Sequence, residues 1–217
     1  MPGKLRINIG CGATPTPGWI NLDNSLTVRV AKVPALPELL NRLHVIGPEQ
    51  LKFARVVRQH GVRWADAVRR IPLPDCSAEV VYSSHMIEHL DPVTEVPRFL
   101  REVRRVLIPG GTLRLAAPDL KRLVRRYVAA GDADEFMASL HMADGTPRGV
   151  VALGRFLIAG VRNHRWMYDA ASLIRLLERH GFRHAKELPP GQTTIPDPGP
   201  LNLREREHES LYMEAKR

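Results

Sequence analysis

The sequence predicts a single α/β domain built on a mostly parallel sheet. Short apolar runs with the two-residue period of strands alternate with stretches whose apolar residues recur at helical spacing. Glycine- or proline-rich turns separate most of these stretches. A chain of 217 residues, of which 44% are hydrophobic, is long enough to bury a core as one domain.

The first half of the chain carries the strands that define this pattern. Apolar and polar residues alternate over 5–9, and the turn Gly10–Gly12 follows at once, which predicts a strand that ends in a tight turn. Further strands are expected over 20–23, 63–66 and 79–84. The later expected strands lie over 112–117, near 185–188 and near 211–215.

Helices are expected in three stretches between the strands. Residues 35–60 contain helical material, and 91–107 carry an apolar stripe that Pro109–Gly111 ends. Asp169 is placed to cap a third helix that ends near Gly181. Strands that alternate with helices favour a parallel sheet, in which ligands bind beyond the carboxyl ends of the strands.

The charge of the chain is strongly basic, with 32 Lys and Arg against 23 Asp and Glu and a net charge of +9. This balance suits a nucleic-acid partner, an anionic membrane surface or an anionic substrate, but also solvated arginine-rich helix faces. Aromatic residues do not interleave with a basic run, so nucleic acid is not the favoured partner. No apolar run approaches the roughly 20 residues of a membrane span.

The cysteines and the start of the chain predict a cytoplasmic location. Two cysteines make no disulfide framework, and no secretory signal is visible.

Three of the expected strands end in residues suited to binding a nucleoside. Gly10 and Gly12 let main-chain amides approach a ligand. Asp23 ends the second strand and can accept hydrogen bonds from both hydroxyls of a ribose. Asp66 ends the third strand and can accept a hydrogen bond from an exocyclic amine such as that of adenine, with a turn or cap as the alternative role. The Gly-x-Gly-x-x-Gly pattern of dinucleotide sites is absent because Pro15 takes its last position.

Several segments in chain order resemble those of a known family. They are 7–12, 19–23, 66–75, 81–90, 105–113, 166–169 and 172–182. The Glu88–Leu90 turn and the Val106–Gly111 turn are the most specific of them. At these residues the chain resembles the class I S-adenosylmethionine-dependent methyltransferases, of the small type-11-like group found in bacterial genomes.

The resemblance implies a Rossmann-like, doubly wound, three-layer α/β/α fold with seven strands, the last of them antiparallel. It also implies S-adenosylmethionine as the cofactor. Its methionine part would lie at the glycine turn, its ribose at Asp23, its adenine at Asp66 and its sulfonium near Ser84 and His85. The cofactor-binding residues implied are Gly10, Cys11, Gly12, Asp23, Asn24, Asp66, Ala67, Ser84 and His85.

One departure from the family concerns the connection between the first two strands. Only residues 13–19 lie there, two of them proline, which is too short for the usual crossover helix. One sheet face would then be bare. We expect the 35–60 segment to cover it with Leu51, Ala54 and Val57.

Candidates for the reaction are histidines and a tyrosine on the acceptor side. A base helps when the acceptor is a hydroxyl or a protonated amine, and histidine is the usual one. The catalytic candidates are His89, His85, His164 and Tyr168. Buried histidines that fix the turn are the alternative. No metal is expected, because no third ligand lies at a suitable spacing.

The acceptor side is less well defined by the sequence. We expect one domain over 1–217, with a helical segment over 27–60 and an acceptor-side insertion over 119–165. That insertion is either a helical lid or a helical pair that completes the core. The proline-rich loop over 189–200 either borders the pocket or only connects strands.

The sequence therefore predicts methyl transfer from S-adenosylmethionine to an oxygen or nitrogen of a small molecule, a metabolite or a glycan precursor. The alternatives are an RNA or protein methyltransferase, and a catalytically silent module that only binds the cofactor.

Overall fold

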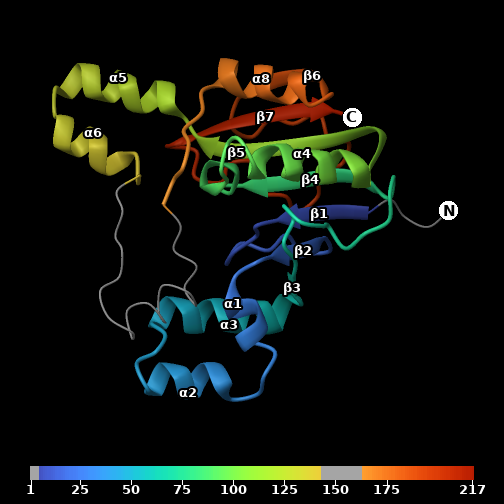
Figure 1. The fold of residues 1–217 in the computed structure, drawn as a ribbon, viewed down its shortest axis with the longest axis vertical. Helices are drawn as coiled ribbons and strands as arrows, with labels where there is room; N and C mark the ends of the chain where they lie inside the picture. Colours follow the sequence, from blue (N-terminus) through green and yellow to red (C-terminus); the bar gives the residue numbers. More distant parts are fainter. Residues whose placement is uncertain (1–4, 143–162) are drawn as a thin grey trace.

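A seven-stranded sheet in the order β3-β2-β1-β4-β5-β7-β6 forms the centre of the computed structural model, which describes residues 5–142 and 163–217 (Figure 1). The strands are β1 (Leu5–Ile9), β2 (Ile20–Asp23), β3 (Arg63–Trp64), β4 (Ala78–Ser84), β5 (Leu107–Pro118), β6 (Arg183–Leu188) and β7 (Ser210–Lys216). β1 to β5 pair in parallel, and β7 is antiparallel to both of its neighbours. The predicted mostly parallel sheet with an antiparallel last strand is confirmed.

Helices flank this sheet. They are α1 (Leu26–Val30), α2 (Leu36–Arg42), α3 (Pro48–His60), α4 (Glu95–Val106), α5 (Leu120–Ala130), α6 (Ala133–Ser139) and α8 (Ala170–Arg179), with a 3₁₀ turn η1 (Ile87–His89) after β4. No helix among the described residues is both long and apolar enough to cross a membrane.

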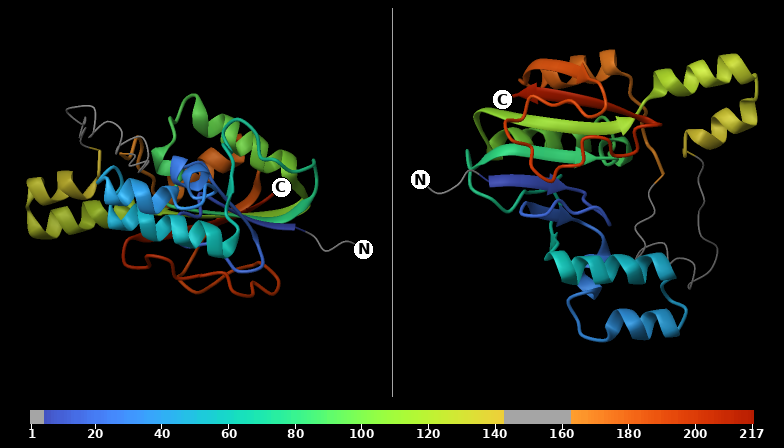
Figure 2. Two further views of the ribbon diagram at one scale, coloured as in Figure 1. Left: turned by 90° about the horizontal axis from the view of Figure 1, so that it is seen from below. Right: turned by 180° about the vertical axis from the view of Figure 1, so that it is seen from behind.

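Helices α4 and α8 cover one face of the sheet (Figure 2). Their apolar stripes are fully buried there, as Phe99, Leu100 and Val103 of α4 and Leu173 and Leu177 of α8 show. Burying one such side chain stabilises the fold by about 1.5–3 kcal/mol. α4 begins later than the predicted residue 91, because the segment before it forms a turn in which the Asp91 carboxylate accepts hydrogen bonds from main-chain N–H groups.

The opposite face is covered by the loop between β6 and β7 (Figure 2, left). Val80 and Tyr82 of β4 pack there against Ile195 and Leu201, and Trp19 joins them from the β1–β2 connection. The proline-rich loop is therefore part of the core and does more than connect strands.

The expectation that the 35–60 segment covers this face is wrong. α3 lies beside the β3 edge and packs against α1 and α2 (Figure 1). Ala54 and Val57 are buried, but against a separate cluster that includes Cys11 and Val28. The physical reason is that apolar side chains of the β6–β7 loop already occupy the face.

A buried ion pair fastens that loop to the sheet. Nη1 of Arg114 in β5 lies 2.7 Å from Oε1 of Glu214 in β7, and neither side chain is more than 2% exposed. Arg114 also donates to the main-chain oxygen of Gln192, while Glu214 accepts from the hydroxyls of Thr193 and Thr194. Charges removed from water in this way need several hydrogen bonds, and here only Nε of Arg114 lacks a partner among the described atoms of the pair.

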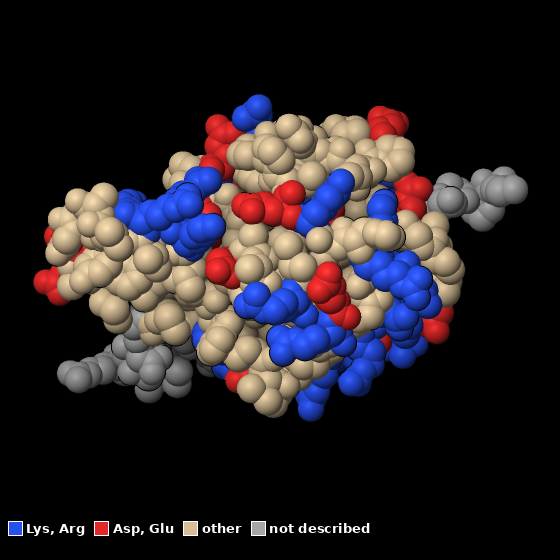
Figure 3. Space-filling model, turned by 90° about the horizontal axis from the view of Figure 1, so that it is seen from above, with Lys and Arg blue, Asp and Glu red and all other residues tan. Residues whose placement is uncertain are grey.

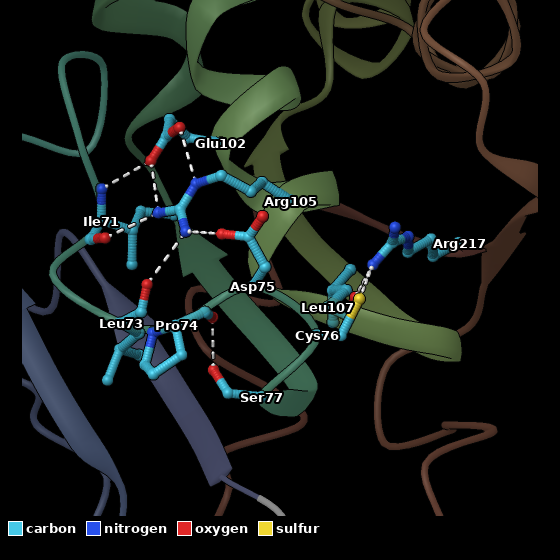
Figure 4. Close-up of polar contacts among 10 residues, drawn as sticks. All are labelled: Ile71, Leu73, Pro74, Asp75, Cys76, Ser77, Glu102, Arg105, Leu107 and Arg217. Atoms are coloured by element: carbon cyan, nitrogen blue, oxygen red, sulfur yellow. Dashed lines mark hydrogen bonds and ion pairs between the residues drawn. The ribbon is translucent and has the colours of Figure 1, made fainter.

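A second arginine holds the segment between β3 and β4 in place (Figure 4). The Arg105 guanidinium donates to the main-chain oxygens of Ile71 and Leu73, and it also contacts the carboxylates of Glu102 and Asp75. Hydrogen bonding to Arg105 lowers the pKa of Glu102, so this pair is ionised at neutral pH. The segment that follows Asp66 is thereby tied to α4.

Helices α5 and α6 project from the sheet as a hairpin (Figures 1 and 2). Neither helix buries a residue, and Tyr127 and Phe136 pack against each other 5.1 Å apart between ring centres. This argues against a helical pair that completes the sheet core. The middle of the predicted insertion, 143–162, with its apolar run, lies outside the described residues.

Candidate functional site

The glycine turn after β1 has a backbone that only glycine adopts without strain. The φ angles of Gly10 and Gly12 are +69° and +48°. A Cβ at Gly10 would lie 2.8 Å from Cγ of Met86, whereas a Cβ at Gly12 would stand in open space. Cys11 between them points into the protein, and burial raises the pKa of its thiol. The turn thus offers main chain, and no reactive thiolate, to a ligand.

Asp23 joins the ends of β1 and β2. Its Oδ2 accepts a hydrogen bond of 3.0 Å from the N–H of Gly12, and its Oδ1 accepts one of 2.8 Å from the N–H of Ser25. The main-chain oxygen of the next residue, Asn24, accepts from the indole of Trp64 in β3. An ionised carboxylate accepts hydrogen bonds and donates none, which suits it to the hydroxyl groups of a ligand.

Asp66 lies two residues beyond β3, which is shorter than the predicted 63–66. Its Oδ1 accepts from the N–H of Val68 at 3.1 Å, so the side chain does shape a turn. The half-buried carboxylate and the buried Ala67 lie next to the Asp23 end of β2, because the N–H of Ala65 bonds to the main-chain oxygen of Asp23. The predicted cofactor residues at the ends of β1, β2 and β3 therefore lie together, beyond the carboxyl ends of these strands.

A buried carboxylate, Glu88, lies among the predicted catalytic histidines. It lies in η1, directly beyond β4, and is 0% exposed. Neither of its carboxylate oxygens has a hydrogen-bond partner in the described part of the chain. Its Oε1 lies 3.4 Å from Nδ1 of His85 and 4.0 Å from Nε2 of His89. His85 also lies 2.7 Å, through Nε2, from the hydroxyl of Ser210.

His164 approaches this cluster from the segment before α8. Its ring centre lies 4.9 Å from that of His89 and 5.4 Å from that of His141. The N–H groups of Arg165 and Trp166 donate to the main-chain oxygen of Glu88, at 2.7 and 3.2 Å. Burial lowers the pKa of His164, so its imidazole is neutral at pH 7.

Tyr168 completes the group. Its hydroxyl is buried without a hydrogen-bond partner among the described residues, and burial with the nearby Glu88 charge raises its pKa to about 12. The N–H of Leu120 bonds to the main-chain oxygen of Tyr168, which ties this segment to the end of β5. The four predicted catalytic candidates thus lie around one carboxylate that the sequence did not single out as their centre. Ser84, at the end of β4, has a buried hydroxyl beside them.

The β6–β7 loop adds site residues that sequence reasoning missed. Both carboxylate oxygens of Glu205 accept hydrogen bonds of 2.8 Å, one from the Thr14 hydroxyl beside the glycine turn and one from the Tyr82 hydroxyl in β4. Ser210 contacts His85 from the start of β7. No local pattern marks these residues, because only the antiparallel return of β7 brings them to the site.

Comparisons with known proteins identify a family and similar folds. A family model described as a methyltransferase domain matches residues 8–115. No curated protein matches the chain.

Several solved structures share the fold. A Haloferax volcanii putative methyltransferase, solved with the Trm112 activator, is 16% identical with a TM-score of 0.50, over 100% of this chain and 84% of that one. PigF with SAH is 14% identical with a TM-score of 0.50, over 99% of this chain and 50% of that one. A Mesorhizobium loti S-adenosylmethionine-dependent methyltransferase is 19% identical with a TM-score of 0.47, over 99% and 91%.

The matched region contains the glycine turn, both aspartates and the Glu88 turn. The seven strands and the antiparallel last strand are those that the resemblance implied. The chain is a class I S-adenosylmethionine-dependent methyltransferase and belongs to the type 11 methyltransferase-domain family.

Proposed function

We propose that this methyltransferase transfers the methyl group to an oxygen or nitrogen of a small-molecule acceptor, such as a metabolite or a glycan precursor. The observation that carries the proposal is the buried Glu88 carboxylate with its imidazoles, immediately beyond β4. β4 is the neighbour of β1, whose glycine turn begins the cofactor side. Cofactor side and acceptor side therefore adjoin at the point where the strand order reverses.

The residues of the cofactor side fit S-adenosylmethionine. Gly12 presents main chain to open space, and two main-chain N–H groups hold the Asp23 carboxylate, an acceptor suited to ribose hydroxyls, at the end of β2. Asp66 and the amide of Ala67 would bind the adenine, and Ser84 and His85 would line the sulfonium end; Cys11 and Asn24 complete the predicted set. The bound cofactor supplies an activated methyl group.

The acceptor-side residues would position the nucleophile and receive its proton. Nδ1 of His89 lies 3.3 Å from the main-chain oxygen of Asn163, and a carbonyl only accepts, so Nδ1 carries the hydrogen. Nε2 of His89 is then the basic atom, and it faces Glu88. His164, His85 and Tyr168 lie around the same carboxylate and would orient the acceptor. Alignment of acceptor and methyl group accounts for much of such catalysis.

The test separates acceptor classes directly. Protein and methyl-labelled cofactor are incubated with a metabolite extract, a purified RNA pool and a denatured protein pool, and label is counted in each fraction. We expect label in the small-molecule fraction, and its loss in His89→Ala but not in His60→Ala, an exposed histidine at the end of α3. Label confined to RNA or protein would refute the small-molecule acceptor. Cofactor binding without transfer to any fraction would support the silent module.

RNA or protein remains the second candidate acceptor because of the net charge of +9 and one basic groove. This groove of about 360 Å³ is lined by Pro97, Arg101, Arg104, Arg105, His180 and Arg217. It lies at the far ends of α4 and α8, away from the Glu88 cluster. On the face shown in Figure 3, basic groups gather in several clusters, and acidic groups lie between some of these. A steep salt dependence of binding to bulk RNA would favour this candidate.

A further inference from the structure

We propose that Glu88, His89 and His164 form a binding site for one divalent transition-metal ion, with Zn²⁺ as the representative. One ligand atom from each of the three side chains lies within 4.8 Å of the other two. The expectation of no metal rested on sequence spacing, which showed no third ligand, and the fold supplies that ligand as His164. The inference rests on the proposed function only in placing the ion on the acceptor side.

The Glu88 carboxylate is a buried group whose oxygens its surroundings do not satisfy. This carboxylate is 0% exposed, and among the described residues neither of its oxygens receives a hydrogen bond. Buried charges in proteins are paired, hydrogen-bonded or bound to a metal. Ring nitrogens of His85 and His89 lie 3.4 and 4.0 Å from its Oε1, and neither is within hydrogen-bond geometry. A cation between these groups would satisfy the carboxylate.

The tautomer of His89 directs a lone pair of its ring toward Glu88. Because its Nδ1–H faces the main-chain oxygen of Asn163, the lone pair of Nε2 faces Oε1 of Glu88 at 4.0 Å. Two electron-pair donors that face each other repel unless a proton or a cation lies between them. A backbone carbonyl on the far ring nitrogen is also the usual second contact of a metal-binding histidine, since it fixes the tautomer and the ring orientation.

His164 is held next to Glu88 and His89. Its Nδ1 is buried and has no hydrogen-bond partner within the described ranges. The N–H of His164 bonds to the main-chain oxygen of His141 at 2.9 Å, and the next two N–H groups bond to that of Glu88. Two of these main-chain bonds join the segment of His164 to Glu88, so these two ligands are held near each other before an ion arrives.

The donor set decides the class of ion. Two imidazoles and one carboxylate bind Zn²⁺ in catalytic sites, where a fourth position stays open, and also bind Fe²⁺. Bonds of about 2.0–2.2 Å at tetrahedral angles place two ligand atoms of one ion about 3.3–3.6 Å apart. The three ligand atoms lie within 4.8 Å of one another, so binding must draw them together by up to about 1.5 Å. An acceptor hydroxyl in the open position would have its pKa lowered by the ion. Nε2 of His89 would then bind the ion and would no longer receive the proton of the acceptor.

The experiment measures metal binding in the full chain, purified without a histidine tag and treated with a chelator. Zn²⁺ is titrated in competition with a chromophoric chelator, and Co²⁺ binding is followed by its visible absorption bands. We expect one ion per chain, and affinity reduced at least about tenfold in Glu88→Gln and in His164→Ala. The matched controls are His60→Ala and His184→Ala, which alter exposed histidines away from the cluster and should leave affinity unchanged.

The outcomes are decisive in either direction. Absence of stoichiometric binding to the wild type, or equal affinity in Glu88→Gln and His164→Ala, would overturn the metal site. Calorimetry with the demethylated cofactor checks that each variant is folded. If Glu88→Gln does not fold, the metal affinity of His164→Gln and the Co²⁺ spectrum of the wild type test the metal site in its place. Metal binding without methyl transfer would refute the proposed function alone, and methyl transfer by a protein that binds no metal would refute this inference alone.

Discussion

The main-chain N–H of Gly12 donates a hydrogen bond of 3.0 Å to Oδ2 of Asp23, which joins the turn after β1 to the end of β2. The connection between these strands contains no helix, so side chains hold it instead. Nδ2 of Asn8 donates to Thr16, and Oδ1 of Asn21 accepts from the N–H of Thr16. The aspartate proposed to bind the ribose therefore also orders the turn proposed to bind the rest of the cofactor.

Replacing Asp23 by alanine should weaken binding of the demethylated cofactor by about 1–3 kcal/mol, the range for leaving buried polar partners unpaired. Asp23→Asn should lose less, because its amide oxygen still accepts one main-chain N–H. Isothermal calorimetry measures both, with Asp134→Asn on exposed α6 as the control. Unchanged affinity in Asp23→Ala would remove this residue from the site.

Replacing Gly10 by alanine should destabilise the protein more than the same change at Gly61. Both residues have positive φ angles, +69° and +63°, so both variants incur similar backbone strain. Only at Gly10 does the new Cβ meet a neighbour, Cγ of Met86 at 2.8 Å, and overpacking adds about 1–3 kcal/mol. Urea unfolding of the two variants gives the difference. Equal losses would show that Met86 moves aside without cost.

Removing one partner of the buried Arg114–Glu214 pair should cost about 3–5 kcal/mol of unfolding free energy, because the other charge stays buried. Arg114→Met alone should be worse than Arg114→Met combined with Glu214→Met. A double-mutant cycle by chemical denaturation measures this. Additive losses in the cycle would contradict the coupling. Methyl-donor binding should also weaken, since the pair fastens the loop that carries Glu205 to the site.

Stability should fall in acid through Asp169, the N-cap of α8. Its hydrogen bond from the N–H of Ser172 lowers the pKa of its carboxyl in the folded state. A depressed folded pKa gives stability that is present above the unfolded pKa, about 3.9, and is lost as pH falls through the folded value.

Asp169→Ala should therefore lose about 1 kcal/mol at pH 7, and the difference should shrink in strong acid. Asp169→Asn retains an acceptor and should remove the pH dependence while keeping most of the cap. Thermal unfolding across pH tests this. A gap between wild type and Asp169→Ala that does not change from pH 7 to pH 2 would be inconsistent with the lowered pKa.

Predictions from sequence succeeded where the signal was local. The alternation before Gly10, the apolar stripe of α4 and the Asp169 cap of α8 are fixed by neighbouring residues, and all three elements are present. Prediction of the cover of the second sheet face failed, since Ile195 and Leu201 lie in a loop with neither helical nor strand periodicity.

The sequence by itself determined an α/β domain with glycines and aspartates at successive strand ends, because these are set by the order of the chain, and its resemblance to a family predicted methyl transfer. Only the tertiary structure decided what surrounds Glu88. His85 and His89 are near it in sequence, but His164 arrives from the segment before α8 and Ser210 from β7. Contacts between distant segments depend on the order of the strands in the sheet and on which main-chain groups pair. No local pattern of residues indicates either of these.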